Sequence, residues 1–135
     1  MFLVQKKPLE TISKNEGSTI NGILRELITL SAAQIVLLVR TDGALIARAG
    51  NMQANDIEAL GALSALMYGA AQSIAASIHT SLSYVHQHGG QKDLLLVRIN
   101  ETVGLIIAYN QDLGLGGILY NARRCAVALG QILGT

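Results

Sequence analysis

The sequence predicts an α+β domain built as a three-layer α/β/α sandwich, in which helices cover both faces of a five-stranded antiparallel sheet. Three observations predict this class. A strong hairpin signal joins two apolar runs within residues 35–49, a long uncharged helix follows, and three short apolar runs separated by tight turns lead to a last amphipathic helix. The predicted element order is therefore α-β-β-α-β-β-β-α.

The N-terminal part of the chain is predicted to be an arm followed by a helix. Residues 1–17 are polar and mixed, so we expect a flexible N-terminal arm or an accessory strand, and residues 18–135 are predicted to form the single folded domain. Ser18 or Thr19 can cap the first helix. Its apolar residues recur at helical spacing along one face and are Ile20, Ile23, Leu24, Leu27 and Leu30.

The hairpin signal lies between the first two predicted strands. An apolar run at residues 35–39 ends at Arg40, and a second run follows at residues 44–49. Asp42 and Gly43 stand between them, and glycine accepts the positive φ that tight hairpin turns require.

A long helix is predicted from Asn55, which forms a variant capping box with Glu58, to about Ile78. No Lys, Arg, Asp or Glu occurs in the 33 residues between Glu58 and Lys92. Small residues at every fourth position form a ridge along this helix, comprising Gly61, Ala65, Gly69, Ser73 and Ser77. Bulkier residues fall on a different sector, namely Leu60, Leu63, Met67, Ile74 and Ile78.

A helix with two uncharged sectors is expected to pack against a protein surface on each of them, where water is excluded. The chain's own sheet supplies one of these surfaces, and a second copy of the protein is the best candidate for the other. The sequence therefore predicts an association module, with the small-residue ridge in the dimer interface.

The C-terminal half predicts a three-stranded meander and a helix. Strands at residues 82–88, 94–99 and 103–109 are joined by short turns and must be antiparallel. The first, fourth and fifth strands are apolar throughout and are predicted to be central, whereas the more polar third strand lies at an edge. Asp112 can cap the last helix. The pattern places the long second helix on one face of the sheet and the other two helices on the opposite face.

Composition excludes several classes of function. A net charge of +1 provides no basic field, which argues against nucleic-acid binding. The lone Cys125 excludes an internal disulfide and fits a reducing cytoplasm. The uncharged stretch includes Gln72 and several Ser and Gly residues, and the rest of the chain is charged and amphipathic, so we predict no membrane span.

No residue set predicts catalysis, a cofactor site or a metal site. A phosphate loop of the GxxxxGK[ST] kind is absent from the sequence. His86 and His88 alternate on one strand and share a face, but no third ligand is identifiable from the sequence. We expect instead an electrostatic role, in which protonation near pH 6 weakens a dimer formed through this strand.

The order and the local sequence resemble the roadblock family, whose members include dynein light chains and scaffolds of Ras-like GTPases. The resemblance covers nearly everything after residue 18 and is carried by IVLLVRTDGALIARAG, by the Ala-rich helix from Asn55, and by ETVGLIIAYNQDLGLGGILYNAR. It implies a homodimer or heterodimer in which the third strands pair edge to edge and the long helices lie side by side. In bacterial relatives, the helix pair and the adjacent loops offer a platform to a Ras-like GTPase.

We therefore expect a cytoplasmic, non-enzymatic dimeric adaptor that binds a Ras-like small GTPase and modulates or localises it. The dimer interface is predicted to comprise Gly61, Ala65, Gly69, Ser73, Ser77, Tyr84 and His86. The partner-binding residues are predicted to be Tyr68, Gln72, Arg123 and Arg124. Tyr68 is chosen over the neighbouring Met67 because the helical angle turns Met67 toward the sheet. The alternatives are a structural scaffold subunit of a larger complex and a small-molecule sensor with polar groups at Tyr84, His86 and Tyr109.

Overall fold

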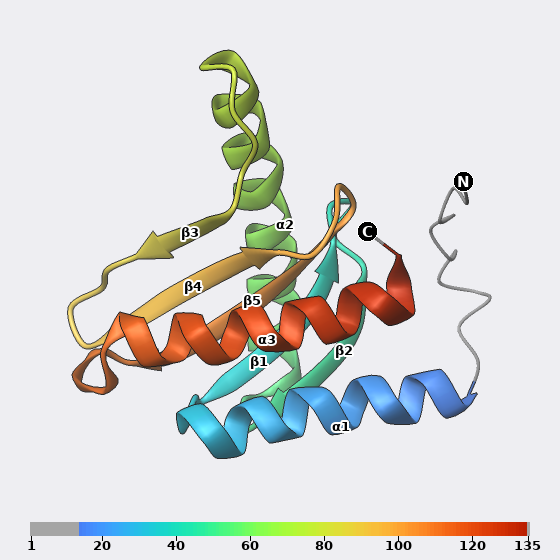
Figure 1. Cartoon of the computed structure of the whole chain (residues 1–135). Helices are drawn as coiled ribbons and strands as arrows, with labels where there is room; N and C mark the ends of the chain where they lie inside the picture. Colours follow the sequence, from blue (N-terminus) through green and yellow to red (C-terminus); the bar gives the residue numbers. More distant parts are fainter. Residues whose placement is uncertain (1–13, 135) are drawn as a thin grey trace.

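The computed structural model describes residues 14–134 and shows the predicted element order (Figure 1). The elements are α1 (Lys14–Ser31), β1 (Ile35–Arg40), β2 (Leu45–Gly50), α2 (Ala54–Ser77), β3 (Tyr84–Gln87), β4 (Lys92–Arg98), β5 (Val103–Asn110), the short 3-10 helix η2 (Gln111–Leu113) and α3 (Leu115–Leu133).

The five strands form one antiparallel sheet in the order β2-β1-β5-β4-β3. The prediction that the first, fourth and fifth strands are central is confirmed, and so is the edge position of β3. Ile106 of β5 lies opposite Leu37 of β1 on one side and opposite Leu96 of β4 on the other. Among the strands of residues 14–134, β2 and β3 are the two that have a neighbour on one side only, so they form the free edges of the sheet.

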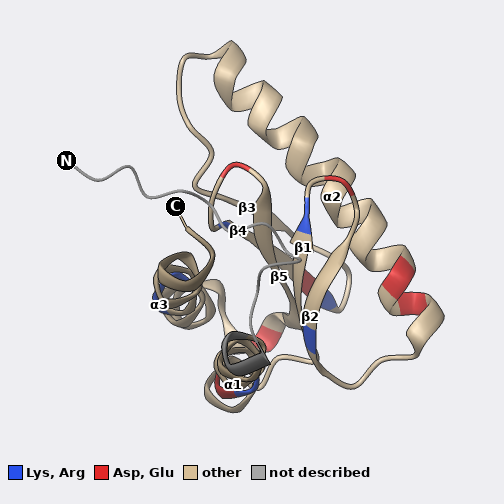
Figure 2. Cartoon of the chain, turned by 90° about the vertical axis from the view of Figure 1, so that its right-hand side faces the viewer, with Lys and Arg blue, Asp and Glu red and all other residues tan. Residues whose placement is uncertain are grey.

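The sheet separates two apolar cores, and Figure 2 shows α2 on one side of the sheet and α1 and α3 on the other. Helices α1 and α3 lie side by side on one face and cover Val36 and Leu38, while α2 lies on the other face and covers Leu37 and Val39. Successive side chains of a strand point to opposite faces. Burial on both faces therefore explains why β1 and β5 are apolar without alternation.

The helix starts differ from the predicted ones. Helix α1 begins at Lys14, so Ser18 and Thr19 lie inside it, and residues 14–17 of the expected arm are helical. Residues 1–13 lie outside the described residues. Gln53 rather than Asn55 occupies the cap position of α2, and no side chain caps the helix. Gly114 precedes α3, with Asp112 in η2. Helices α1 and α2 begin earlier than predicted because helical backbone extends to the N-terminal side of the expected caps, whereas α3 begins later because Gly114, with a φ of 79°, separates it from η2.

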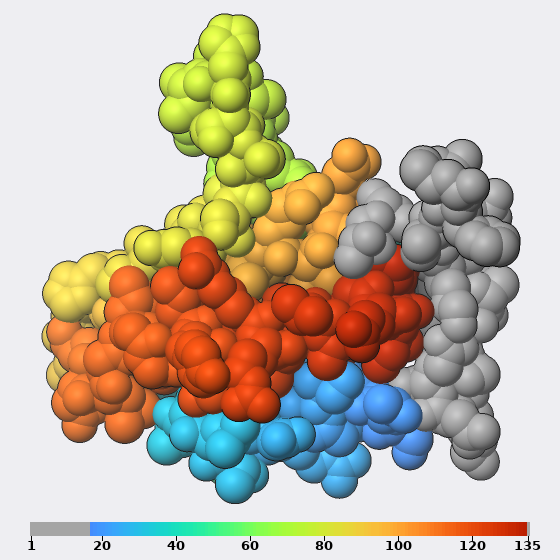
Figure 3. All heavy atoms as spheres, in the orientation of Figure 1, coloured from blue at the N-terminus to red at the C-terminus, as the bar shows by residue number. Residues whose placement is uncertain are grey.

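Helix α2 projects beyond the sheet. Its first half lies across β1 and β5, whereas its C-terminal half and the segment leading to β3 stand out from the body of the molecule (Figures 1 and 3). After Tyr68, Ala75 is the one buried residue of α2. By length and apolar composition alone, α2 would also suit a membrane span.

Candidate functional site

The exposed face of α2 carries large apolar side chains. Leu63, Leu66, Ile74 and Ile78 are 64%, 71%, 65% and 69% exposed, respectively. With the exposed Ala70 they follow one another three or four positions apart, so they form one stripe along the helix. We call Leu63, Leu66, Ala70, Ile74 and Ile78 the α2 apolar stripe. Figure 2 shows that charge on α2 is confined to its first turns.

The opposite face of α2 packs on the chain's own sheet. Its buried residues are Ile57, Gly61, Ser64, Ala65, Tyr68 and Ala75. A Cβ built on Gly61 would lie 3.7 Å from Cγ1 of Val39, an ordinary contact distance, which shows how closely the helix approaches β1 at this point.

The small-residue ridge is therefore not one exposed surface, which corrects the prediction from sequence. Gly61 and Ala65 are buried against the sheet, Gly69 is half-buried, and Ser73 and Ser77 are exposed. The reason is geometric: steps of four residues advance by about 40° on a helix of 3.6 residues per turn, so four steps rotate the ridge by about 160°. Gly61 and Ala65 have no surface to offer to a second copy.

Tyr68 is also buried, so its predicted role as a partner anchor is corrected. The Tyr68 hydroxyl donates a hydrogen bond to the carbonyl oxygen of Asn100. Burial raises the pKa of Tyr68 to about 12; Arg98 opposes this rise and Glu101 adds to it. Met67, which was predicted from the helical angle to pack on the sheet, is only partly buried. Tyr68 is therefore the main contact of the two with the sheet.

Gln72 lies one turn further along α2 and contacts the same β4–β5 turn. Its Nε2 donates a hydrogen bond to the carbonyl oxygen of Glu101 at 3.2 Å. The half-buried Gln72 side chain thus helps to hold α2 against the body of the domain, while its partner-binding role stays a prediction.

Two residues predicted for different roles lie together beside β3. The Arg123 guanidinium lies 5.3 Å from the centre of the Tyr84 ring, and its Nη2 donates a hydrogen bond to Ser83 Oγ at 3.1 Å. Arg123 thereby connects α3 to the strand at the free edge. Arg124 points elsewhere, with its guanidinium 5.8 Å from the Tyr120 ring.

A carboxylate that the sequence analysis missed joins the two histidines. Oδ2 of Asp93 lies 2.7 Å from His86 Nε2, and Oδ1 lies 2.9 Å from His88 Nδ1 and 3.1 Å from the Gly89 backbone nitrogen. Asp93 is buried and is the second residue of β4, which begins at Lys92 rather than at the predicted Leu94. The signal was present as cross-strand spacing: His86 lies opposite Leu95, two residues from Asp93 on the same face.

The electrostatics of this cluster follow from its contacts. Burial disfavours the charged form of Asp93, but the hydrogen bonds from His86, Gly89 and His88, with the nearby His88 charge, outweigh it and lower the Asp93 pKa. Within residues 14–134, no group of three or more His, Cys, Asp or Glu side chains has the arrangement of a metal site. The hydrogen bonds of Asp93 to His86, His88 and the Gly89 backbone connect the two ends of the β3–β4 turn.

Tyr109 lies opposite Asp93 in the register of β4 and β5. Its ring is fully buried, and its hydroxyl lacks a hydrogen-bond partner in the part of the chain that the structure describes. Burial raises the Tyr109 pKa, and the charge of Asp93 adds to the effect. The sensor hypothesis named this residue with Tyr84 and His86; Tyr109 is the one of the three that solvent does not reach.

Comparison with known proteins places this architecture. No protein-family model and no curated protein sequence matches the chain. Among solved structures, MglB of Myxococcus xanthus is similar over 90% of this chain and 92% of that one, with a TM-score of 0.83 and 24% identity. The chain has the roadblock fold. A Roadblock/LC7 domain from Streptomyces avermitilis is similar over 85% of this chain and 98% of that one, with a TM-score of 0.78 and 13% identity.

A third solved structure is also similar to this chain. It is described as MglB with a tetrameric arrangement and is similar over 86% of this chain and 88% of that one, with a TM-score of 0.79 and 20% identity. At these identities the likeness shows the fold, and the positions of the functional side chains come from this chain's own structure.

Proposed function

We propose that this chain is a self-associating, non-enzymatic adaptor of the cytoplasm that binds a Ras-like small GTPase and modulates or localises it. The observation that carries the proposal is the α2 apolar stripe. Four of its large side chains are mostly exposed on a helix that has no charge beyond its first turns. Contiguous apolar surface of this kind on a small domain is typical of a protein–protein contact.

A second copy of the same chain is the occupant that best fits the stripe. Two-fold association places the same surface of both copies in contact, so an uncharged apolar stripe meets an equally uncharged one. The free edge of β3 offers a second surface for the same contact, since its outer backbone groups have no strand to pair with. Self-association is also the state named for one of the similar structures, MglB with a tetrameric arrangement.

The GTPase partner rests on the roadblock resemblance and on the residues that carry it. The chain itself lacks a phosphate loop of the GxxxxGK[ST] kind, which suits a protein that binds a nucleotide-binding partner rather than the nucleotide. The C-terminal stretch that carries the resemblance to the roadblock family, residues 101–123, ends at Arg123, which stays in the proposal as a partner contact beside Tyr84.

The proposal is tested with the full chain in two measurements. Light scattering during size exclusion gives the mass across protein concentrations, and we expect a dimer. The same protein, immobilised, is then incubated with extract of its source cells containing either GDP or a non-hydrolysable GTP analogue, and we expect a small GTPase to be retained differently in the two.

The outcomes separate the two parts of the proposal. A monomer at tens of micromolar contradicts self-association. A dimer that retains no GTPase with either nucleotide contradicts the GTPase partner and favours a structural scaffold subunit.

A further inference from the structure

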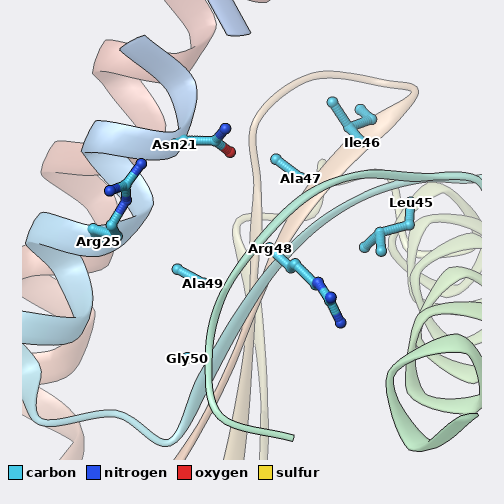
Figure 4. A pocket seen from close by; sticks show the side chains of 8 residues that line it. All are labelled: Asn21, Arg25, Leu45, Ile46, Ala47, Arg48, Ala49 and Gly50. Atoms are coloured by element: carbon cyan, nitrogen blue, oxygen red, sulfur yellow. The ribbon is translucent and has the colours of Figure 1, made fainter. Parts of the chain in front are cut away.

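The second free edge of the sheet lies at the opposite side from β3 and borders a hollow. The hollow has a volume of about 540 Å³ and lies between β2 and α1 (Figure 4). Its lining comprises Asn21 and Arg25 of α1 and all six residues of β2, which are Leu45, Ile46, Ala47, Arg48, Ala49 and Gly50. The outer edge of β2 therefore borders open space along its whole length.

The lining is basic and contains no carboxylate. Arg25 and Arg48 are both exposed, and within residues 14–134 neither forms an ion pair or a hydrogen bond through its side chain. Asp56 and Glu58 on the first turns of α2 are not paired with Arg48 either. Two guanidinium groups are thus left beside backbone groups that lack a partner strand.

The two arginines lie on opposite faces of the sheet. Arg48 pairs with Leu37, which belongs to the core under α2, whereas the neighbouring Ala47 and Ala49 face the core under α1 and α3. Figure 4 shows Asn21 and Arg25 on the α1 side of β2 and the Arg48 side chain directed away from α1. An added strand would present successive side chains to these two faces in turn.

We propose that the β2 edge binds an extended acidic segment of a partner protein as a sixth strand, with two consecutive carboxylates, one directed to Arg25 and the next to Arg48. Strand addition supplies backbone hydrogen bonds. The guanidinium groups select carboxylates because a guanidinium can donate two parallel hydrogen bonds to the two oxygens of one carboxylate. Asn21 adds a polar side chain beside Arg25. The irregular register between Leu38 and Val39 disrupts the Leu45 end of β2, so the added strand pairs along residues 47–50.

This contact is independent of the proposed self-association, which uses α2 and the edge of β3. The two edges are separated by three strands of the sheet, so a dimer formed through β3 leaves both β2 edges open. One adaptor could then hold an acidic segment at each end of the joined sheet.

The test uses the full-length protein and a fluorescein-labelled peptide, Gly-Val-Thr-Glu-Glu-Thr-Val-Gly, measured by fluorescence anisotropy. Two control peptides replace both Glu with Gln, or place Pro in the middle of the sequence to prevent strand pairing. We expect the acidic peptide to bind more tightly than either control, and its affinity to fall as salt rises. Equal binding of the Gln peptide, or no binding at millimolar peptide, overturns the proposal.

Protein variants test the assignment of residues. Arg25→Gln and Arg48→Gln should each weaken binding about two- to fivefold, as for exposed charge pairs, and the double variant should bind more weakly still. Lys92→Gln is the matched control, because it removes the same charge from an exposed side chain on β4 that does not line the hollow. The proposal is overturned if the control weakens binding as much as the β2-edge variants, or if those variants bind like the wild type.

The mass of each variant, measured by light scattering, keeps this test separate from the proposed function. The Arg25 and Arg48 variants should have the same oligomeric state as the wild type. Amide chemical shifts give a second readout, and we expect the largest peptide-induced changes at residues 47–50. Changes centred on β3 or α2 instead would overturn the proposal.

Discussion

The Tyr68 ring lies directly over the backbone of Gly104, so close that a Cβ built on the glycine would be 3.0 Å from Cδ2 and 3.1 Å from Cε2 of the ring. The ring cannot easily move away, because Tyr68 is fully buried and its hydroxyl is bonded to the Asn100 carbonyl. The approach of α2 thus explains why a glycine stands at the second position of the central strand β5.

Gly104→Ala should therefore lower the free energy of unfolding by about 1–3 kcal/mol, the usual range for overpacking. Urea denaturation followed by circular dichroism measures the change. Gly22→Ala is the control: it lies on the exposed side of α1, where an added Cβ meets nothing within 4 Å. There the alanine should stabilise the protein by roughly 0.5–1 kcal/mol. A neutral effect at Gly104 would mean that the ring is free to shift.

The two fully buried tyrosines should respond differently to loss of the hydroxyl. Tyr68→Phe removes a hydrogen bond and leaves the Asn100 carbonyl without it, so we expect a loss of about 1–2 kcal/mol in the free energy of unfolding. The Tyr109 hydroxyl has no partner within the described residues, so Tyr109→Phe should leave stability unchanged or raise it by up to about 1 kcal/mol. Parallel urea titrations compare the two, and equal losses would contradict the assigned contacts.

The lowered pKa of Asp93 predicts a dependence of stability on acid pH. The folded state holds the carboxylate ionised to lower pH than the unfolded state, whose value is near 3.8. The resulting stabilisation is complete above that unfolded value and is lost as pH falls through the folded value. Asp93→Asn should therefore be less stable than the wild type at pH 7, and the difference should shrink below about pH 3.8.

Urea titrations at pH 7, 5 and 3 measure this difference. Asp112→Asn is a matched control, since Asp112 is an exposed aspartate in η2 without a histidine partner. It should follow the wild type at each pH. A constant gap between Asp93→Asn and the wild type at all three values would show that the carboxylate acts through packing rather than through its charge.

The burial of strands could be predicted from the pattern of apolar residues along the sequence. Contacts that depend on which residues of two neighbouring strands lie opposite each other could not. Continuous apolar runs placed β1 and β5 in the middle of the sheet because both faces of a central strand are buried. The contact of Asp93 with two histidines depends on which residues of β3 and β4 lie opposite each other, and short strands leave that register open.

The interface of α2 was misread for a different reason. Spacing alone placed Gly61 and Ser77 on one ridge, but the ridge winds around the helix, and the sheet covers only its first part. Which side of α2 faces the sheet is decided by Ile57 and Tyr68, and in a helix whose sectors are both uncharged no pattern of charge reveals that choice.

The exposed side of α2 gives the decisive variant for self-association. Ile74→Glu places a charge in the middle of the α2 apolar stripe. If the stripe is buried between two copies, each copy loses about 1.5–3 kcal/mol of apolar burial. In a two-fold dimer both copies carry the substitution in the interface, so the loss of binding free energy is doubled. The dissociation constant should therefore rise by on the order of a hundredfold or more. Sedimentation equilibrium across a concentration series measures it.

Val127→Glu is the matched control for that experiment. Ile74 and Val127 are each 65% exposed, but Val127 lies on α3, on the opposite face of the sheet. Both variants should keep the wild-type circular dichroism spectrum, because neither side chain is part of a buried core. Dissociation caused by the α3 substitution and not by the α2 substitution would move the interface to the α1–α3 face, and the stripe would then need a different partner.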